Sequence, residues 1–190
     1  MKKIAVFASG SGSNFQALVD AAKANQLSAE IALLVCDKPG AYAIERADKE
    51  GVPSLAISPK DFASKIDYEK EILRKLDESG AELIVLAGYM RLIGETLLSA
   101  YEGRIVNIHP SLLPSFPGKD AIGQAFQAKV KITGVTVHYV DEGMDTGPII
   151  AQEAVKMDEN ETRESLEAKI HQVEHLLYPN VIQKLCSGEK

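Results

Sequence analysis

The sequence has few cysteines, little positive charge and no long hydrophobic run, and each shortage narrows the kind of protein it can be. Its 190 residues hold two cysteines, Cys36 and Cys186, without CxxC spacing, so both thiols are expected to stay free, as suits a reducing cytosol. Lysine and arginine number 21 against 27 acidic residues. The resulting net charge of −6 argues against a nucleic-acid-coating surface, which needs a basic balance.

The hydrophobic runs are short throughout. The first one, at residues 4–8, is followed by glycines and serines and is too short for a secretory h-region or a membrane span, and no later run qualifies. We therefore expect a cytoplasmic protein without a membrane partner. What the chain does contain is a 45% share of hydrophobic residues, enough for a single domain with a substantial core over residues 1–190.

Apolar runs alternate with helical patterns along the first part of the chain. Continuous apolar strands that alternate with helices are typical of a parallel sheet with both faces covered. The pattern therefore predicts an α/β fold with an open, Rossmann-like, mostly parallel sheet. Strands are expected at residues 4–8, 31–36, 52–57, 83–87 and 105–108, and helices at residues 14–25, 42–50, 67–79 and 95–100.

The pattern changes after Pro117. Residues 132–140 alternate in the manner of a half-exposed strand, and residues 148–155 are a candidate antiparallel partner. Residues 162–186 form a long terminal helix, which Pro179 is expected to interrupt. Because no repeat or linker divides the chain, we predict one domain whose C-terminal part is mixed or antiparallel.

The strongest chemical signal is the segment Asn-Ile-His-Pro-Ser at residues 107–111. Pro110 must end the strand, and residues two apart on a strand face the same side, so Asn107 and His109 should project together at its carboxyl end. Asp145 follows in a turn-like stretch. An amide and an imidazolium could hold a developing oxyanion, while a carboxylate keeps the histidine cationic. This chemistry suits acyl transfer in which the substrate supplies its own nucleophile.

Each of these residues also has a plain structural interpretation. A histidine ahead of a proline can simply shape a turn, and Asp145 stands in Asp-Thr-Gly, which is good turn chemistry. Their coincidence with Asn107 at a strand end favours function, because open α/β sheets place their sites there.

A glycine-rich loop at residues 10–14 follows the first strand and opens the first helix. A helix N-terminus presents free N–H groups, so this loop is a natural phosphate cradle. The dinucleotide fingerprint fails because Phe15 takes its third glycine position, and no Walker A lysine follows. The loop suits one phosphate monoester better than a pyrophosphate. The alternative is that Ser13 and Gln16 form a capping box and the glycines only make a turn.

Residues 171–175 match the H-x-x-E-H motif of one class of zinc proteases. His171 and His175 would share a helix face, but a third ligand is needed for catalytic zinc. We interpret the match as accidental and expect no metal. His138, within a strand pattern, is interpreted as a structural histidine rather than a ligand.

Several segments together resemble the folate-dependent formyltransferase family, most closely those members that formylate phosphoribosylglycinamide. The resemblance covers essentially the whole chain. It implies that the amine of 5-phosphoribosylglycinamide attacks the formyl carbon of 10-formyltetrahydrofolate, giving formylglycinamide ribonucleotide and tetrahydrofolate in de novo purine biosynthesis. The segments that carry it are residues 9–14, 87–91, 107–114, 134–138 and 145–148.

The resemblance also implies roles for single residues. Asn107 and protonated His109 would stabilise the oxyanion of the tetrahedral intermediate, with Asp145 keeping His109 cationic. His109, or a water near Asp145, would then protonate the departing N10 of the folate. Binding of the ribotide is implied for Gly12, Ser13, Asn14 and Glu174, and binding of the folate for Lys65, Met90, Arg91, Leu92, Ile93, Asn107, Val140, Asp141 and Asp145.

The same resemblance divides the domain into an N-terminal phosphate-binding half, about residues 1–100, and a C-terminal catalytic and folate-binding half, about residues 101–190. The expected partners are the two small-molecule substrates, with no nucleic acid, in a monomer or homodimer. Residues 117–120 depart from members that carry histidine after the Pro-Gly pair, which leaves the role of Lys119 and Asp120 open.

Four other protein classes compete with the interpretation as a phosphoribosylglycinamide-formylating enzyme. Methionyl-tRNA formyltransferases are longer, with an added domain for tRNA, and formyltetrahydrofolate hydrolases usually carry an N-terminal regulatory domain. A non-catalytic folate- or phosphate-binding protein would not need Asn107, His109 and Asp145 together. A metallohydrolase using His171 and His175 is disfavoured most strongly.

Overall fold

A seven-stranded sheet forms the centre of the computed structural model, which describes residues 1–188. The strand order is β3-β2-β1-β4-β5-β6-β7. The first five strands in sequence pair in parallel, whereas β6 pairs antiparallel with β5 and β7 antiparallel with β6. The expected mostly parallel sheet with an antiparallel C-terminal part is confirmed. The strands are β1 (Lys2–Ala8), β2 (Ala29–Cys36), β3 (Ser54–Ala56), β4 (Leu83–Leu86), β5 (Ile105–His109), β6 (Ile132–Tyr139) and β7 (Ile149–Lys156).

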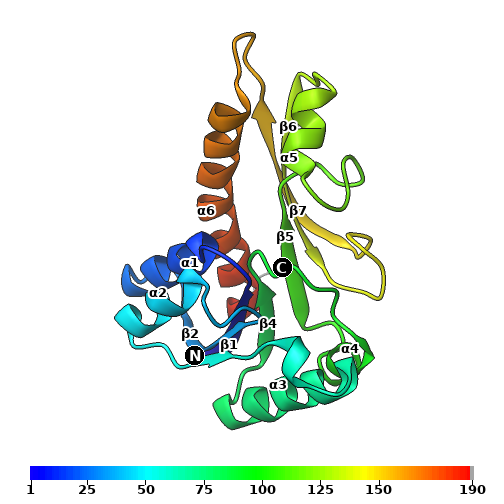
Figure 1. Cartoon of the computed structure of the whole chain (residues 1–190). Coiled ribbons are helices and arrows are strands. Elements are labelled where there is room, and N and C mark those ends of the chain that lie inside the picture. The colour runs from blue at the N-terminus through cyan, green and yellow to red at the C-terminus, as the bar shows by residue number, and fades with distance from the viewer. Residues whose placement is uncertain (189–190) are drawn as a thin grey trace.

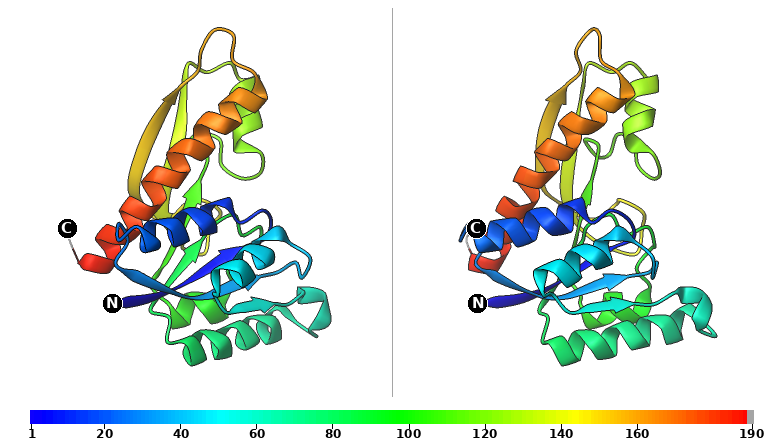
Figure 2. Two further views of the ribbon diagram at one scale, coloured as in Figure 1. Left: turned by 90° about the vertical axis from the view of Figure 1, so that its left-hand side faces the viewer. Right: turned by 60° about the vertical axis from the view of Figure 1, so that its left-hand side comes forward.

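Helices cover both faces of this sheet (Figures 1 and 2). Helices α1, α2, α5 and α6 pack on one face, and α3 and α4 pack on the other. The last two residues of the expected domain, 189–190, lie outside the described part of the chain. The helices are α1 (Ser13–Lys23), α2 (Tyr42–Glu50), α3 (Lys65–Ser79), α4 (Glu95–Ala100), α5 (Ala121–Gln127) and α6 (Arg163–Ser187), with a short 3₁₀ helix η1 (Pro59–Asp61).

Strand β1 explains why the apolar runs are continuous rather than alternating. Ile4 and Val6 lie in the core beneath α1 and α6, while Ala5 and Phe7 lie in the core beneath α3 and α4. All four are fully buried. A strand covered on both faces needs apolar side chains at every position, so its sequence loses the two-residue period of an exposed sheet.

The expectation of a half-exposed strand over residues 132–140 is wrong. In β6 every residue from Thr133 to His138 is buried. One face of β6 packs against α6, and Thr136 is hydrogen-bonded to the loop that follows β5, through the Leu113 amide and the Ser111 carbonyl. The polar side chains of Thr136 and His138, which look exposed in the sequence, are here buried and hydrogen-bonded.

The expected interruption of the terminal helix near Pro179 is also wrong, because α6 runs on to Ser187. Proline removes one backbone hydrogen bond from a helix interior. The neighbouring Tyr178 is fully buried, and its hydroxyl donates to the Leu86 carbonyl oxygen at 2.6 Å. Packing of α6 against α1 and the sheet therefore keeps the helix continuous through the proline.

The helix α5 was missed by the sequence pattern. It is only seven residues long and contains Gly123, so neither length nor propensity marks it. Its start is fixed by Asp120, whose side chain accepts from the Gly123 amide. Among the helices of residues 1–188, none is long and apolar enough to cross a membrane.

Candidate active site

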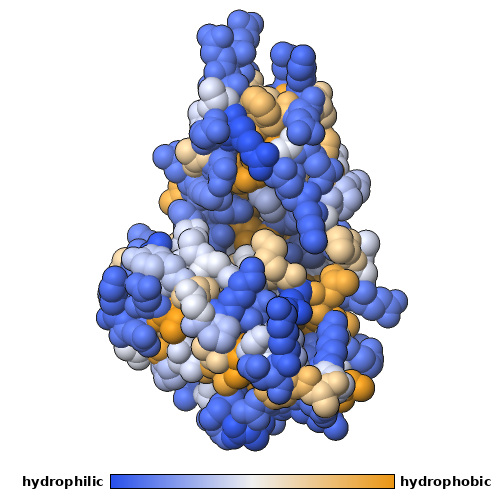
Figure 3. All heavy atoms as spheres, in the orientation of Figure 1, coloured by the Kyte–Doolittle hydropathy of each residue, from blue (hydrophilic) through white to orange (hydrophobic). Residues whose placement is uncertain are grey.

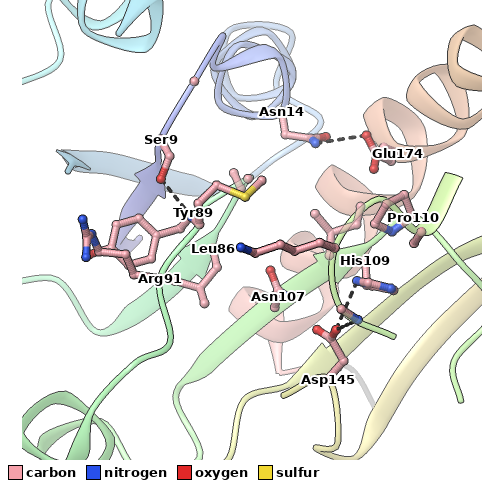
Figure 4. A pocket seen from close by; sticks show the side chains of 18 of the residues that line it. Ser9, Asn14, Leu86, Tyr89, Arg91, Asn107, His109, Pro110, Asp145 and Glu174 are labelled. Carbon is pink, nitrogen blue, oxygen red and sulfur yellow. Dashed lines mark hydrogen bonds and ion pairs between the residues drawn. The ribbon is translucent and has the colours of Figure 1, made fainter. Parts of the chain in front are cut away.

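A cavity of about 760 Å³ opens at the carboxyl ends of β1, β4 and β5. The strand β1 lies between β2 and β4, so the chain order reverses beside it, and open α/β sheets bind ligands at such a point. The loops after these strands line the cavity, and residues of α6 close one side (Figure 4). The face of the molecule seen in Figure 3 is mostly hydrophilic, with hydrophobic residues in separate patches.

Asn107 and His109 project into this cavity from the end of β5, as the strand period predicted. His109 is 6% exposed, so its ring is shielded from bulk water except on the cavity side. The antiparallel register places Asn107 opposite His138 and His109 opposite Thr136. The sheet therefore delivers four polar side chains to one end of two adjacent strands.

The two ring nitrogens of His109 face different oxygen atoms. The Nε2 atom lies 2.9 Å from the Phe116 carbonyl oxygen, and the Nδ1 atom lies 3.6 Å from Oδ2 of Asp145 (Figure 4). A carbonyl and a carboxylate both accept hydrogen bonds, so each ring nitrogen of His109 faces an acceptor.

Asp145 is held in place by the backbone around it. Its Oδ2 atom accepts from the Gly118 amide at 2.8 Å, and its own φ of 55° is the left-handed conformation that aspartate tolerates. A Cβ at Gly147 would lie 1.8 Å from the Tyr139 carbonyl oxygen, so only glycine lets the two ends of this loop approach. The Gly118 hydrogen bond and the close approach at Gly147 therefore fix the loop so that Asp145 faces His109.

Asp141 stabilises the same loop from its other side. Its carboxylate accepts from the Gly143 amide at 2.9 Å and from the Thr146 hydroxyl at 2.7 Å. The bond from Thr146 is the main reason that the pKa of Asp141 lies below its usual value. The side chain is exposed and closes a local turn, so it shapes the loop that lines the cavity.

His138 is a site residue that the sequence reasoning assigned to structure. It is buried and hydrogen-bonded, as expected, but it also lines the cavity. Its Nδ1 atom donates to the Tyr139 carbonyl oxygen at 2.8 Å, which leaves Nε2 to accept from the Asn107 amide at 3.3 Å. One N–H of Asn107 is thereby fixed, and the other stays free for a substrate oxygen. The oxygen Oδ1 of Asp145 lies 3.9 Å from the same Nε2 atom.

The glycine loop forms the opposite end of the cavity. Gly12 has a φ of 72°, and a Cβ there would lie 2.8 Å from the Cα of Ala43, so glycine is required on both counts. The alternative capping box of Ser13 and Gln16 is not formed. Gly12 caps α1 without a side-chain bond, and the Gln16 side chain turns to Asp20 and Glu50 instead. The first turn of α1, including Ser13, therefore lines the cavity with its amides uncapped by side chains.

Glu174 reaches this end of the cavity from α6. It is 6% exposed and accepts from the Asn14 side-chain amide at 3.2 Å (Figure 4). Burial raises the pKa of Glu174, and the charge of His171 and the bond from Asn14 offset that effect only in part. The structure thus brings together all four residues expected to bind the ribotide.

The two histidines of the H-x-x-E-H segment differ in position. His171 lines the cavity, whereas His175 does not, although their rings stack at 6.2 Å. Burial, with the charges of His171 and Arg46, lowers the pKa of His175. Within residues 1–188 no three His, Cys, Asp or Glu side chains are grouped so that they could hold a metal ion.

The residues expected to bind the folate line the same cavity, except for Lys65. Met90 and Leu92 are exposed there, and the Arg91 Nε atom donates to the buried Asp37 carboxylate at 2.9 Å. Lys65 instead lines a neighbouring cavity of about 390 Å³. The two cavities share Tyr89, Met90, Arg91 and Leu92. The lining residues that agree with the expectation are Met90, Arg91, Leu92, Ile93, Asn107, Val140, Asp141 and Asp145.

Ser9 was not expected in the site but connects two of its loops. Its hydroxyl accepts from the Met90 amide at 2.9 Å, which ties the end of β1 to the loop after β4 (Figure 4). Lys38, Arg163 and Glu167 also line the cavity. The sequence did not predict them as site residues, because each is an isolated charged residue outside any motif. Both halves of the chain therefore contribute to one cavity.

Comparison with known proteins gives consistent relatives. The family model described as formyl transferase matches residues 2–182. Phosphoribosylglycinamide formyltransferase of Bacillus subtilis (strain 168) is 60% identical, and the match covers all of both chains. A trifunctional purine biosynthetic protein of Drosophila melanogaster is 45% identical over 98% of this chain, which spans 14% of that protein.

Solved structures agree with these sequence matches. Glycinamide ribonucleotide transformylase 1 from Geobacillus kaustophilus superposes with a TM-score of 0.95 at 67% identity, covering 97% of this chain and 98% of that one. Phosphoribosylglycinamide formyltransferase from Bacillus halodurans superposes with a TM-score of 0.96 at 58% identity, covering 100% and 97%.

Proposed function

The chain belongs to the formyl transferase family, and from that premise we propose how its cavity performs the reaction. The protein transfers the formyl group of a 10-formyl folate to the amine of 5-phosphoribosylglycinamide, a step of purine biosynthesis. The observation that carries the proposal is the meeting of Asn107, His109 and Asp145 between a phosphate cradle and an apolar wall.

We propose that Asn107 and His109 stabilise the tetrahedral intermediate. The amine nitrogen forms a bond to the formyl carbon, and the formyl oxygen takes up the electron pair of the carbonyl bond. The second N–H of Asn107 and a protonated His109 ring would meet that negative charge, since both side chains line the cavity. Losing one such donor typically costs about 10²–10³-fold in turnover.

Collapse of the intermediate breaks the bond between the formyl carbon and N10 of the folate. The attacking nitrogen then loses a proton and N10 gains one, so the net change is one proton moved between two nitrogens. His109, whose ring lies 3.6 Å from Asp145, or a water beside Asp145, is proposed to carry it. Proton transfer of this kind is typically worth about 10²–10⁴-fold.

The ribotide is proposed to bind across the α1 and α6 end of the cavity. The amides of Gly12, Ser13 and Asn14 would hold its phosphate at the helix N-terminus, and Glu174 would accept from its hydroxyl or amide groups. The N-terminal half of the domain thus supplies the phosphate site and the C-terminal half most of the catalytic groups.

The formyl folate is proposed to lie along residues 90–93 and 140–145. Exposed Met90 and Leu92 offer apolar contact to its rings, and the cations Arg91 and Lys65 lie where an acidic tail could reach them. We propose that the enzyme works in the cytoplasm on these small molecules, as a monomer or homodimer.

A spectrophotometric assay of 10-formyl folate deformylation tests the proposal. Turnover should require the ribotide and should fall by about 10²–10⁴-fold in His109→Ala. Deformylation without the ribotide would identify a hydrolase instead. Tight folate binding without turnover in either condition would identify a binding protein and contradict the proposal.

A further inference from the structure

The loop that follows β5 selects which nitrogen of His109 can exchange a proton. The Nε2 atom lies 2.9 Å from the Phe116 carbonyl oxygen, and a carbonyl only accepts, so Nε2 carries hydrogen. A neutral His109 therefore has its bare nitrogen at Nδ1, which is the atom 3.6 Å from Asp145. The position of one backbone carbonyl decides the tautomer of the proposed catalytic base.

The Phe116 carbonyl reaches that position through an uncommon backbone conformation. Phe116 has a φ of 52°, which bulky residues rarely adopt, and such a conformation persists only where the surroundings impose it. The Ser111 hydroxyl donates to the Ser115 carbonyl oxygen at 2.6 Å and lies 3.3 Å from the Phe116 carbonyl oxygen. It thus holds the two peptide groups on either side of the Phe116 Cα.

Ser111 is itself fastened to the sheet. Its own carbonyl oxygen accepts from the Thr136 hydroxyl at 2.7 Å, and Thr136 stands opposite His109 in the register of β5 and β6. The Thr136 oxygen accepts in turn from the Leu113 amide and the Gln152 side-chain amide, both at 3.0 Å. Ser111 and Thr136 are fully buried, so these bonds do not compete with water.

We propose that Ser111 is a positioning residue for the transfer reaction. Its hydroxyl sets the conformation at Phe116, the Phe116 carbonyl fixes the orientation and tautomer of His109, and Thr136 anchors Ser111 to β6. The inference rests on the catalytic role proposed for His109. A continuous series of hydrogen bonds connects the buried Ser111 hydroxyl with the His109 ring.

Kinetics of Ser111→Ala provide the first test. We expect kcat to fall about 10- to 100-fold while both KM values stay within about twofold, because the ring is misplaced and the binding surfaces are not. Ser79→Ala is the matched control, since its hydroxyl also donates to a backbone carbonyl, at 2.8 Å, but in α3 away from the cavity. Unchanged kcat in Ser111→Ala would overturn the proposal.

The second test determines the tautomer itself. Imidazole ¹⁵N chemical shifts are measured at a pH where His109 is neutral. In the unmodified protein His109 should be the Nε2–H tautomer, and in Ser111→Ala a mixture. A wild-type ring with hydrogen on Nδ1 would overturn the proposal without any variant. If Ser111→Ala does not fold, Thr136→Ser should keep kcat and Thr136→Val should lower it; equal kcat in the pair would contradict the proposed anchor.

These outcomes separate the inference from the function it rests on. If His109→Ala turns over normally, the proposed catalytic role fails and the inference falls with it. If His109→Ala is inactive while Ser111→Ala keeps wild-type kcat and tautomer, only the positioning role is overturned.

Discussion

The two ends of the cavity are built in different ways. The ribotide end consists of regular elements, the first turn of α1 and one face of α6, which pack against each other. The proposed catalytic end combines the end of β5 with irregular backbone, in which Phe116 and Asp145 both have positive φ. A phosphate can be bound by several backbone N–H groups, which a helix N-terminus supplies. Proton transfer instead requires that single hydrogen bonds direct the proton to one atom.

The contrast predicts a separation of kinetic effects. Changes at the catalytic end should lower kcat, because they alter groups that act on the transition state, and changes at the ribotide end should raise KM. Substitutions at each end test whether the two kinetic effects separate.

Asp145→Asn should have the largest effect. It keeps the shape of the side chain and an acceptor for the Gly118 amide, but it removes the charge that faces His109. We expect kcat to fall roughly 10²–10³-fold, with folate affinity and thermal unfolding little changed. Steady-state kinetics and a folate-binding titration measure this. A near-normal kcat would remove Asp145 from the mechanism.

Glu174→Gln should raise the ribotide KM about tenfold and leave kcat close to normal, because a hydrogen bond to a charged group is lost while the catalytic groups stay in place. Initial-rate kinetics against ribotide concentration measure the effect. The control is Glu164→Gln, which changes an exposed carboxylate in the first turn of the same helix. A fall in kcat without a rise in KM would place Glu174 with the catalytic groups.

Ser13→Ala should raise the ribotide KM by roughly twofold to tenfold, since it removes one neutral hydroxyl while the backbone amides remain. The structure shows no capping bond from this side chain, so the melting temperature of the variant should match that of the wild type. An unchanged KM would assign phosphate binding to the backbone alone.

The smallest effect concerns stability and pH. Burial raises the pKa of Glu174, so the folded state binds a proton more tightly than the unfolded state. Stability is then highest below the unfolded pKa and decreases as pH rises through the interval up to the folded pKa. Glu174→Gln should remove this loss, and urea unfolding at pH 4 and pH 7 should show a gain only at pH 7. A gain that is equal at both pH values would point to packing rather than charge.

Much of the fold followed from local pattern. The bounds of α2 and α4 agree with the expected residues 42–50 and 95–100, because each helix has its own apolar period and clear ends. The continuity of α6 at Pro179 and the burial of β6 did not follow, since both depend on packing against elements distant in sequence.

The site divides in the same way. The strand period predicted that Asn107 and His109 face the same side, and the glycine loop was predicted to belong to the site; all of them line the cavity. His138 could not be recognised, because its role depends on the register of β6 against β5 across a long connection. Ser111 and Thr136 gave no signal, since a buried serine or threonine is informative only once its partners are known.

The strand order has a consequence for how the protein behaves among its own copies. In the described chain the sheet has two edges, β3 and β7. The first edge is only three residues long, and the second exposes the charged side chains of Glu153 and Lys156. Short or charged edges are poor templates for strand pairing between molecules. Both margins of the sheet that presents Asn107 and His109 are therefore expected to resist edge-to-edge aggregation.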